Sequence, residues 1–464
     1  NRRAFNRSRR RGSRMCIKAQ LQQLRLHRFT LVAAVCSAII VILTIATAST
    51  GVRVRYADLN PAELTNANGR IVLHTSVPIK RVAPEQVSLA PAVSVSVATN
   101  GNTIIITPNE RLRYQTDYRV RIHDVAGQYG RQRSDIEYRF STPAAKLYYL
   151  HRQYSGGDEN KANDQIIAAT MQSEKTEVLF AAPRILEFVV MRDELVVNTY
   201  RDGVSQLQRV NVNDKRTQAM PVAKPQLAAK LQSLGDGRRV GYITGEHSDT
   251  KGGQLQLLDL VGGSSRAIEH AGAVTDWRAS PDGRVIAAVT VKGDLLLIDT
   301  AGKKQPRPLG SASELGDFSS DGRKLSFLGS AGGFMVHDLE KNERRAVFSD
   351  SVHANSYIVR LKLLGKNARL MQSMFIADRK PGSEVTYNDG RSVARLYRSD
   401  SAHDITGLSA SPNSQYAAVE VAPQQGSSFD NYPLNGRNMS TRTVLVDQGG
   451  TVVRTIDGCG VAWK

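Results

Sequence analysis

One short run of side chains in this sequence could bind a metal ion: Glu246, His247 and Asp249, in a glycine-flanked segment. Carboxylates and imidazoles are ligands that divalent cations accept. This run supplies too few ligands alone, and no second cluster at ligand spacing accompanies it. Other histidines stand singly, at His151, His270, His337, His353 and His403. We therefore predict no metal site.

Two further patterns come close to chemical motifs and fail. The stretch DENKAND, which begins at Asp158, is similar to a calcium-binding EF-hand loop. However, Ala162, Asp164 and Ala169 occupy positions that need a ligand, a glycine and a glutamate. The stretch 262–266, GGSSR, lacks the final glycine of a hydrolase nucleophile elbow. No glycine-rich phosphate loop precedes a helix, so we predict no catalytic residue and no cofactor.

The acidic residues that do recur belong to Asp-Gly turns. Asp236–Gly237, Asp282–Gly283 and Asp321–Gly322 stand in similar turns spaced by about 40–45 residues, and Ser411–Gln415 is a decayed copy. Glycine accepts a positive φ, while aspartate hydrogen-bonds within its own turn. A residue that recurs once in every repeat favours a structural role. We interpret these six residues as structural turns.

The elements around these turns define the architecture. Each turn is followed by an apolar strand and then by a strand that ends in aspartate, at Asp259, Asp299, Asp338 and Asp447. The unit built on Ser280-Pro281-Asp282-Gly283 resembles the TolB-type, WD40-like propeller repeat, strongly over 274–313 and 314–355. The resemblance implies a β-propeller over 146–464, with one four-stranded blade per repeat. We count about seven blades, which start near residues 146, 186, 227, 274, 314, 356 and 405.

The two ends of this region are expected to meet. The C-terminal sequence CGVAWK reads like the innermost strand of a new blade just before its turn. Paired with the first blade, it would close the ring and remove exposed sheet edges.

Residues 52–142 predict a separate small β domain. Short strands follow one another at roughly ten-residue spacing without a helical period, which is typical of a sandwich of about seven strands. The pattern resembles the bacterial Ig-like domains of surface-layer proteins, which act as spacers or binding modules. The resemblance rests on Ile71, Leu73, Val77–Ile79, Leu112, Thr116, Tyr118, Val120, Ile122 and Phe140–Thr142.

The net charge of +19 is concentrated at the N-terminus. Residues 1–28 contain ten basic side chains and no acidic one, and the first acidic residue is Asp58. Arg-rich arms can neutralise nucleic-acid phosphates. Beside an apolar segment, however, they favour membrane topology or contact with anionic headgroups, so we predict no nucleic-acid partner.

Residues 29–48 carry no charge and are long enough to cross a bilayer as a helix. The basic residues before them predict a cytoplasmic tail (1–28), a transmembrane helix (29–48) and extracytoplasmic domains. A cleaved signal peptide is the alternative, because Ala46-Thr47-Ala48 has the small-x-small spacing of a cleavage site. The apolar run is longer than a typical signal peptide, so we favour a retained anchor.

A long insertion interrupts the last repeat. Residues 424–442, QQGSSFDNYPLNGRNMSTR, separate two strands that stand much closer in the other units. Insertions in rigid repeats often bind partners. Phe429, Tyr432 and Arg437 form our candidate partner-binding loop, and a merely tolerated loop is the alternative.

The predicted protein is therefore all-β beyond its transmembrane helix, with an Ig-like sandwich and then a propeller. We favour a membrane-anchored cell-surface binding or scaffold protein with a protein or cell-envelope glycan partner and no small-molecule substrate. The alternative is a lyase- or lactonase-like enzyme whose residues converge in the central channel. Such a site would leave no local motif.

Overall fold

A computed structural model of the chain describes Ser37 and residues 51–464, apart from 67–68, 130–131, 154–162, 222–226, 246–251, 269–271, 366, 378, 426–428, 431 and 435. The chain separates into two compact units. The first contains most residues up to Ser141, and the second contains Thr142–Lys464 together with two short segments, 65–67 and 110–116.

None of the helices in the described part of the chain is long and apolar enough to cross a membrane. The predicted tail, 1–28, lies outside the described residues. So does the predicted span, 29–48, except for Ser37.

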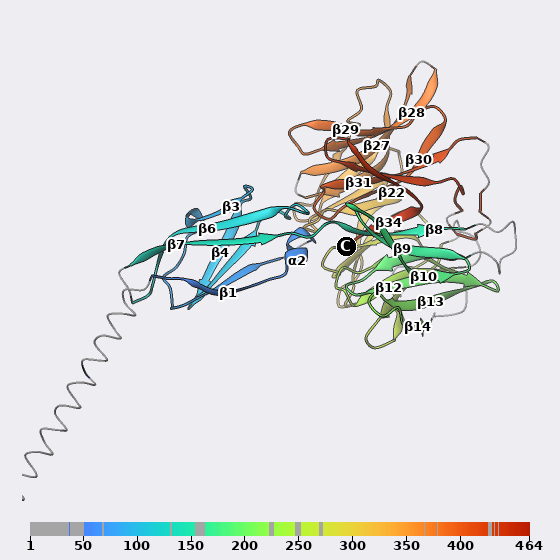
Figure 1. The fold of residues 1–464 in the computed structure, drawn as a ribbon. Coiled ribbons are helices and arrows are strands. Elements are labelled where there is room, and N and C mark those ends of the chain that lie inside the picture. The colour runs from blue at the N-terminus through green and yellow to red at the C-terminus, as the bar shows by residue number, and fades with distance from the viewer. Residues whose placement is uncertain are drawn as a thin grey trace, which may run out of the picture. The chain divides into compact units, whose positions relative to one another are not determined.

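The first unit consists of two antiparallel sheets (Figure 1), one in the order β1-β2-β5-β4 and the other in the order β3-β6-β7. Ile71, Leu73 and Thr75 are buried on one face of β2, as the alternation predicts, and β6 alternates in the same way from Tyr118 to Ile122. The strands are β1 (Val54–Leu59), β2 (Ile71–Thr75), β3 (Val87–Ala90), β4 (Val95–Asn100), β5 (Thr103–Pro108), β6 (Asp117–Ala126) and β7 (Arg133–Ser141).

A short helix, α2 (Pro61–Asn66), stands between β1 and β2, where the sequence pattern predicts only strands. Asn60 explains its start, because its side-chain oxygen accepts from the N–H of Ala62 at 3.1 Å. This is the capping interaction that favours a helix N-terminus, and proline at the first helical position suits it too.

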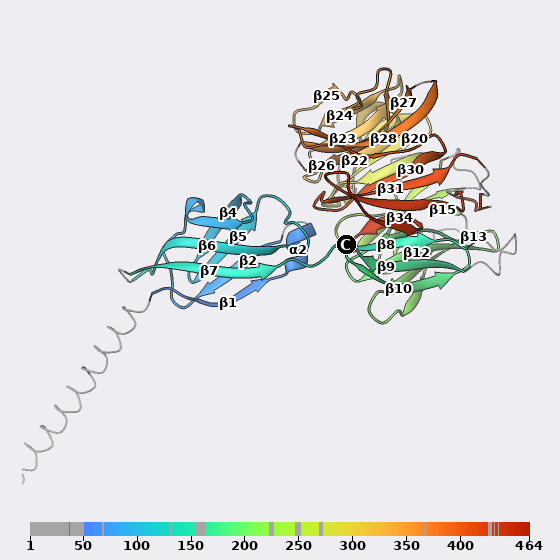
Figure 2. The same cartoon turned by 45° about the horizontal axis from the view of Figure 1, so that its top comes forward.

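The second unit contains five four-stranded sheets and one seven-stranded sheet among its described residues, all antiparallel (Figure 2). The four-stranded sheets are β34-β8-β9-β10, β11–β14, β15–β18, β26–β29 and β30–β33. Their strands are β8 (Lys146–His151), β9 (Asp164–Thr170), β10 (Ser173–Ala182), β34 (Cys459–Trp463), β11 (Ile185–Val190), β12 (Glu194–Arg201), β13 (Val204–Asn211), β14 (Thr217–Met220), β15 (Leu227–Ser233), β16 (Arg239–Gly245), β17 (Gln254–Asp259), β18 (Ser265–Ala267), β26 (Tyr357–Leu364), β27 (Ala368–Ala377), β28 (Lys380–Asn388), β29 (Val393–Arg398), β30 (His403–Ala410), β31 (Tyr416–Pro423), β32 (Arg442–Asp447) and β33 (Val452–Asp457).

The seven-stranded sheet joins two of the predicted repeats. It comprises β19 (Val274–Ala279), β20 (Val285–Thr290), β21 (Asp294–Asp299), β22 (Arg307–Phe318), β23 (Lys324–Gly329), β24 (Phe334–Asp338) and β25 (Glu343–Ala346). The long strand β22 pairs with β21 through its first half and with β23 through its second half. Gly310, at φ +100°, lies at the register irregularity within the pairing with β21. The predicted boundary near residue 314 falls inside β22.

The sheets form a closed ring. The C-terminal strand β34 pairs antiparallel with β8, which confirms the predicted closure by the chain end (Figure 1). The first strands of the four-stranded sheets, together with β19 and β22 of the seven-stranded sheet, contact one another (β34 with β11, β11 with β15, β15 with β19, β19 with β22, and β22 with β26), and β30 contacts β34. These strands are therefore the inner strands that surround the central channel.

The second strands explain why the repeats are so apolar. Five consecutive residues of β12, five of β16 and seven of β31 are buried, so burial extends to both faces of these strands. A strand with neighbouring sheets on both sides needs apolar residues at consecutive positions, as the sequence predicts.

Candidate functional site

The Asp-Gly turns lie between the first and second strands of their sheets, and their carboxylates bond within the turn. Asp282 Oδ1 accepts from Ser280 Oγ at 2.7 Å and from the Arg284 N–H at 3.1 Å. Although partial burial opposes ionisation, these hydrogen bonds lower the pKa of Asp282. Asp236 and Asp321 accept from their own turns in the same way. Their geometry supports the structural interpretation.

Neighbouring turns of this kind pack tightly against each other. A Cβ atom on Gly235 would lie 2.2 Å from the carbonyl oxygen of Pro281, and one on Gly283 would lie 2.2 Å from that of Leu234. Arg239 adds a hydrogen bond from Nη2 to the Gly283 carbonyl at 3.1 Å. Between these sheets the turns therefore fill the space at this end of the ring.

The β26–β29 sheet lacks such a turn. β26 ends at Leu364 and β27 begins at Ala368, whereas the connection from Ala279 to Val285 holds a complete Ser-Pro-Asp-Gly-Arg turn. A Cβ atom on Gly365 would meet nothing within 4 Å. The shorter connection leaves open space where the sheets with an Asp-Gly turn have packed turns. The connection between β11 and β12 is equally short, since β11 ends at Val190 and β12 begins at Glu194.

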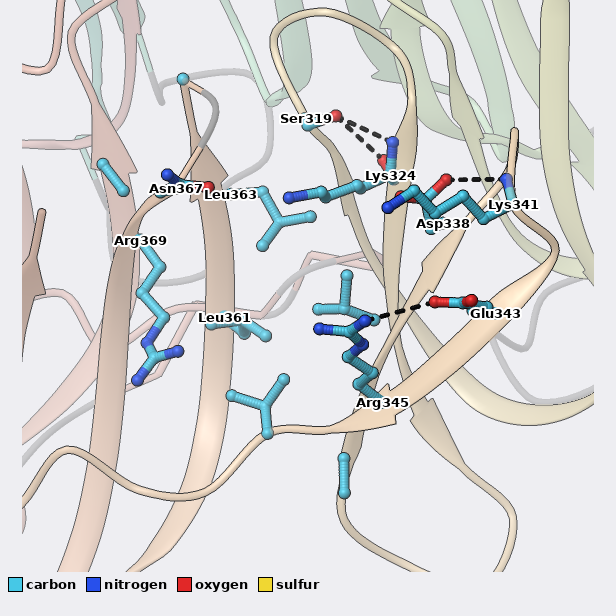
Figure 3. A pocket seen from close by; sticks show the side chains of 15 residues that line it. Ser319, Lys324, Asp338, Lys341, Glu343, Arg345, Leu361, Leu363, Asn367 and Arg369 are labelled. Carbon is cyan, nitrogen blue, oxygen red and sulfur yellow. Dashed lines mark hydrogen bonds and ion pairs between the residues drawn. The ribbon is translucent and has the colours of Figure 1, made fainter. Parts of the chain in front are cut away.

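This space is part of a groove of about 340 Å³ between the two neighbouring sheets. Figure 3 shows Leu361, Leu363 and Asn367 on one wall, and Lys324 and Arg345 on the other. Aliphatic side chains form its floor, namely those of Val336, Val347, Leu361 and Leu363. They belong to the apolar cluster that joins the two sheets, so the groove is an open edge of the protein core.

Charged side chains surround this floor. The lining residues include four basic ones, Lys324, Lys341, Arg345 and Arg369, and two acidic ones, Asp338 and Glu343. The backbone N–H of Lys341 donates to Asp338 Oδ1 at 3.0 Å and lowers the pKa of Asp338. The Asp338 carboxylate is therefore hydrogen-bonded within its own turn. Arg369 pairs with Asp350 and Arg345 with Glu343. Lys341 makes no ion pair with any residue that the structure describes, so the rim has an excess of positive charge.

The predicted partner-binding loop lies elsewhere and is largely internal. Tyr432 is only 9% exposed and packs with Leu186, Leu227 and Leu434. Its hydroxyl donates to Asp164 Oδ2 at 2.8 Å. Leu186 and Leu227 stand at the starts of β11 and β15, so the insertion lies across inner strands at one end of the channel.

Two ion pairs hold the insertion in place. Arg152 Nη1 lies 2.6 Å from Asp430 Oδ2, with the two side chains 5% and 1% exposed. Arg437 pairs with Glu420, whose other oxygen accepts from the N–H of Gly460 at 2.6 Å. The insertion thereby contacts the ring closure at Arg152, next to the end of β8, and is linked to Gly460 of β34 through Glu420 of β31.

Among the three predicted loop residues, Phe429 is the most exposed, at 62%, whereas the paired Arg437 side chain is 28% exposed. The internal roles of Tyr432 and Arg437 were not foreseen from the sequence, because their partners are distant in the chain. Burial beside Asp164 raises the pKa of Tyr432, so this hydroxyl stays protonated as a hydrogen-bond donor.

The inner strands carry charged residues that face neighbouring sheets. Arg278 Nη1 lies 2.9 Å from Asp276 Oδ1, and its Nε lies 3.5 Å from Asp317 Oδ1. Lys362 Nζ lies 2.6 Å from the other oxygen of Asp317. Although burial opposes ionisation, Lys362 and Arg278 lower the pKa of Asp317. These carboxylates are matched by cations and link three inner strands, β19, β22 and β26.

No group of three or more His, Cys, Asp or Glu side chains in the described part of the chain could hold a metal ion. The run Glu246, His247 and Asp249 lies outside the described residues, as does most of the Asp158 stretch. Asp164 accepts hydrogen bonds from Tyr432 and from two backbone N–H groups, which supports a structural role for this carboxylate.

The closed ring of antiparallel sheets defines the second unit as a β-propeller, the fold expected from the repeat. No protein-family model matches the chain, and no curated protein does either. Solved structures share the fold. The propeller domain of the Trilobed protease from Pyrococcus furiosus is 9% identical (TM-score 0.45, 67% of this chain and 92% of that chain). TolB from Acinetobacter baumannii is 12% identical (TM-score 0.36, 61% and 79%). An oligogalacturonate lyase in complex with manganese is 12% identical (TM-score 0.42, 65% and 83%).

Proposed function

We propose that this protein is a membrane-anchored, extracytoplasmic binding protein. In this proposal residues 29–48 anchor the chain, an Ig-like sandwich acts as a spacer, and a seven-bladed, TolB-like propeller binds a partner at the cell surface. The uncharged segment after an Arg-rich tail supports the anchor. The two-sheet arrangement of the first unit supports the sandwich.

The observation that carries the binding function is the groove at Gly365. Its aliphatic floor is open to solvent, and concave apolar surfaces with a few polar groups are the usual form of binding sites. The inner-strand carboxylates favour binding over catalysis, because cations already neutralise Asp276 and Asp317. Exposed Phe429 offers a second contact for the same or another partner.

A filled groove tests this function. Ala346 lies on exposed β25 and lines the groove, so Ala346→Trp should occupy it without disturbing the core. The full chain, purified in detergent and immobilised, should retain a component of solubilised envelopes from its own cells, and A346W should retain less than a tenth as much. Ala331→Trp, in an exposed turn away from the groove, is the matched control. Equal retention by A346W and A331W would place binding elsewhere.

Protease added to intact cells tests the orientation. We expect it to degrade residues 142–464 in whole cells. Protection in whole cells together with degradation in disrupted cells would show that the proposed topology is wrong.

A further inference from the structure

The groove has a chemistry that discriminates between classes of partner. None of its lining residues is aromatic, and its floor consists of branched aliphatic side chains. A sugar surface is mostly hydroxyl, and hydroxyls pressed against such a floor would lose their hydrogen bonds to water without replacement. A branched aliphatic side chain would instead bury its own surface there. The floor therefore favours a protein over a glycan.

The propeller itself shows how such a position is filled. At another junction, between β15 and β19, Leu234 begins an Asp-Gly turn, is fully buried and presents its carbonyl to Gly283. The β26–β29 sheet has no counterpart to this turn, and Val336, Val347 and Leu363, partly buried side chains of the cluster around Leu361, line the groove. A partner side chain of leucine or valine size would complete the packing between the two sheets.

The basic residues at the rim of the groove favour negative charge on the partner, next to its aliphatic side chain. Lys341 is exposed and without an ion pair among the described residues, and Arg345 is held only by an exposed pair with Glu343, at 3.2 Å. Exposed pairs of this kind contribute about 0–1 kcal/mol, so Arg345 can exchange its partner readily. Carboxylates on the bound segment would meet both cations.

The strand at the groove offers a way to hold an extended backbone. β25 is the last strand of its sheet, and no described strand pairs with its outer edge. All of its residues are exposed. Extended peptides bind such edges by adding a strand, while alternate side chains enter adjacent pockets.

From these observations we propose that the groove binds an extended protein segment in which a branched aliphatic side chain stands next to acidic residues. This inference rests on the proposed binding function and names its partner class. The aliphatic side chain enters between Leu361 and Val336, and the acidic residues lie against Lys341 and Arg345.

Site-specific photo-cross-linking in the full chain on intact cells tests the proposal. A photoreactive phenylalanine at Asn367, an exposed residue that lines the groove, should capture a peptide that carries leucine, isoleucine or valine beside Asp or Glu. The same probe at Asn213, in an exposed turn between β13 and β14, is the control position. Mass spectrometry of the adduct identifies its chemical class.

Charge variants sharpen the test. The double variant Lys341→Glu and Arg345→Glu should lower the yield at Asn367 at least tenfold. Lys341→Arg keeps the charge and should keep the yield, and Lys303→Glu is a matched exposed control outside the groove. Because all of these side chains are exposed, we expect the variants to fold, which an unchanged thermal midpoint would verify.

The outcomes separate the two proposals. A carbohydrate or lipid adduct, a peptide without acidic residues, or a yield unaffected by charge reversal would overturn the partner class while leaving a binding function in place. A yield at Asn367 no higher than at Asn213 would overturn both.

Discussion

Replacing Asp430 by alanine should destabilise the propeller strongly, because it leaves a buried guanidinium without its carboxylate. Arg152 and Asp430 are 5% and 1% exposed, and their nitrogen and oxygen lie 2.6 Å apart. Removing one partner of a buried ion pair costs about 3–5 kcal/mol. Arg152 keeps other interactions, among them a hydrogen bond to the Leu186 carbonyl at 3.1 Å and a position 4.4 Å from the Tyr432 ring centroid. Because these interactions persist in the variant, we expect a loss of stability near the lower end of this range of about 3–5 kcal/mol.

The corresponding thermal shift can be worked out from the size of the unit. An unfolding entropy of about 2.1 cal/mol/K per residue over roughly 320 residues converts 1 kcal/mol into about 1.5 °C. We therefore expect Asp430→Ala to lower the midpoint by about 4–7 °C. Trp277 and Trp463, the two tryptophans of the chain, both lie in this unit, so intrinsic fluorescence of the full chain follows its unfolding.

A surface pair in the same sheet provides the control. Asp457 lies 3.3 Å from Arg442, and these side chains are 76% and 69% exposed. Asp457→Ala should cost about 0–1 kcal/mol, a shift below about 2 °C. Similar shifts for the two alanine variants would refute the reasoning. Combining Asp430→Ala with Arg152→Met should recover part of the loss, because no unpaired charge then stays buried.

Three further predictions concern the repeat and the ring closure. Gly237→Ala, at φ +69° with nothing within 4 Å, should cost about 1–2 kcal/mol in chemical unfolding. Gly283→Ala, at φ +67° with its new Cβ 2.2 Å from a neighbouring carbonyl, should cost at least about 1 kcal/mol more, and equal costs would contradict the packing of the turns. Burial raises the pKa of the Cys459 thiol to about 11. Alkylation of Cys459 at pH 8, measured by peptide mapping, should therefore be about 100-fold slower in the folded protein than after unfolding, and comparable rates would show an open closure. The lowered pKa of Asp282 means that its contribution to stability is present above about pH 4 and is lost as the pH falls through its folded value. Asp282→Asn, which copies the natural Asn413 turn, should lose less stability between pH 4 and 2 than the unchanged protein, and parallel pH profiles would contradict this.

Sequence periodicity was sufficient to predict the propeller because its signals are local. A turn such as Ser280–Arg284 fixes its own geometry through hydrogen bonds between near neighbours, and the apolar strands after it report burial on both faces. The ring closure was also predictable, since an unpaired strand at the C-terminus needs a partner and β8 needs a neighbour.

The contacts of the insertion were not predictable in this way. Tyr432 bonds to Asp164, which lies 268 positions away in the chain, and Asp430 pairs with Arg152 at a separation of 278. Composition alone does not distinguish an aromatic residue in a loop that binds a partner from one that packs across a channel. The sequence suggested that the insertion was free to bind a partner because it does not reveal the contacts of the insertion within the propeller.

The two departures from the repeat act in opposite ways, and this explains why one was noticed and the other missed. Added residues draw attention in a sequence, but in a ring they find neighbouring surfaces to cover, as Tyr432 does over the starts of β11 and β15. Missing residues leave no motif to see. The interval between Asp321 and Asn413 is long enough for one more repeat whose turn motif is missing. Whether the missing turn leaves a groove depends on how neighbouring turns pack, as Gly283 packs against Leu234. Where the turn is short, at Gly365, nothing fills the corresponding space and the apolar core stays open. The shortened turn, and not the inserted loop, therefore accompanies the groove at this junction, although the connection between β11 and β12 is equally short.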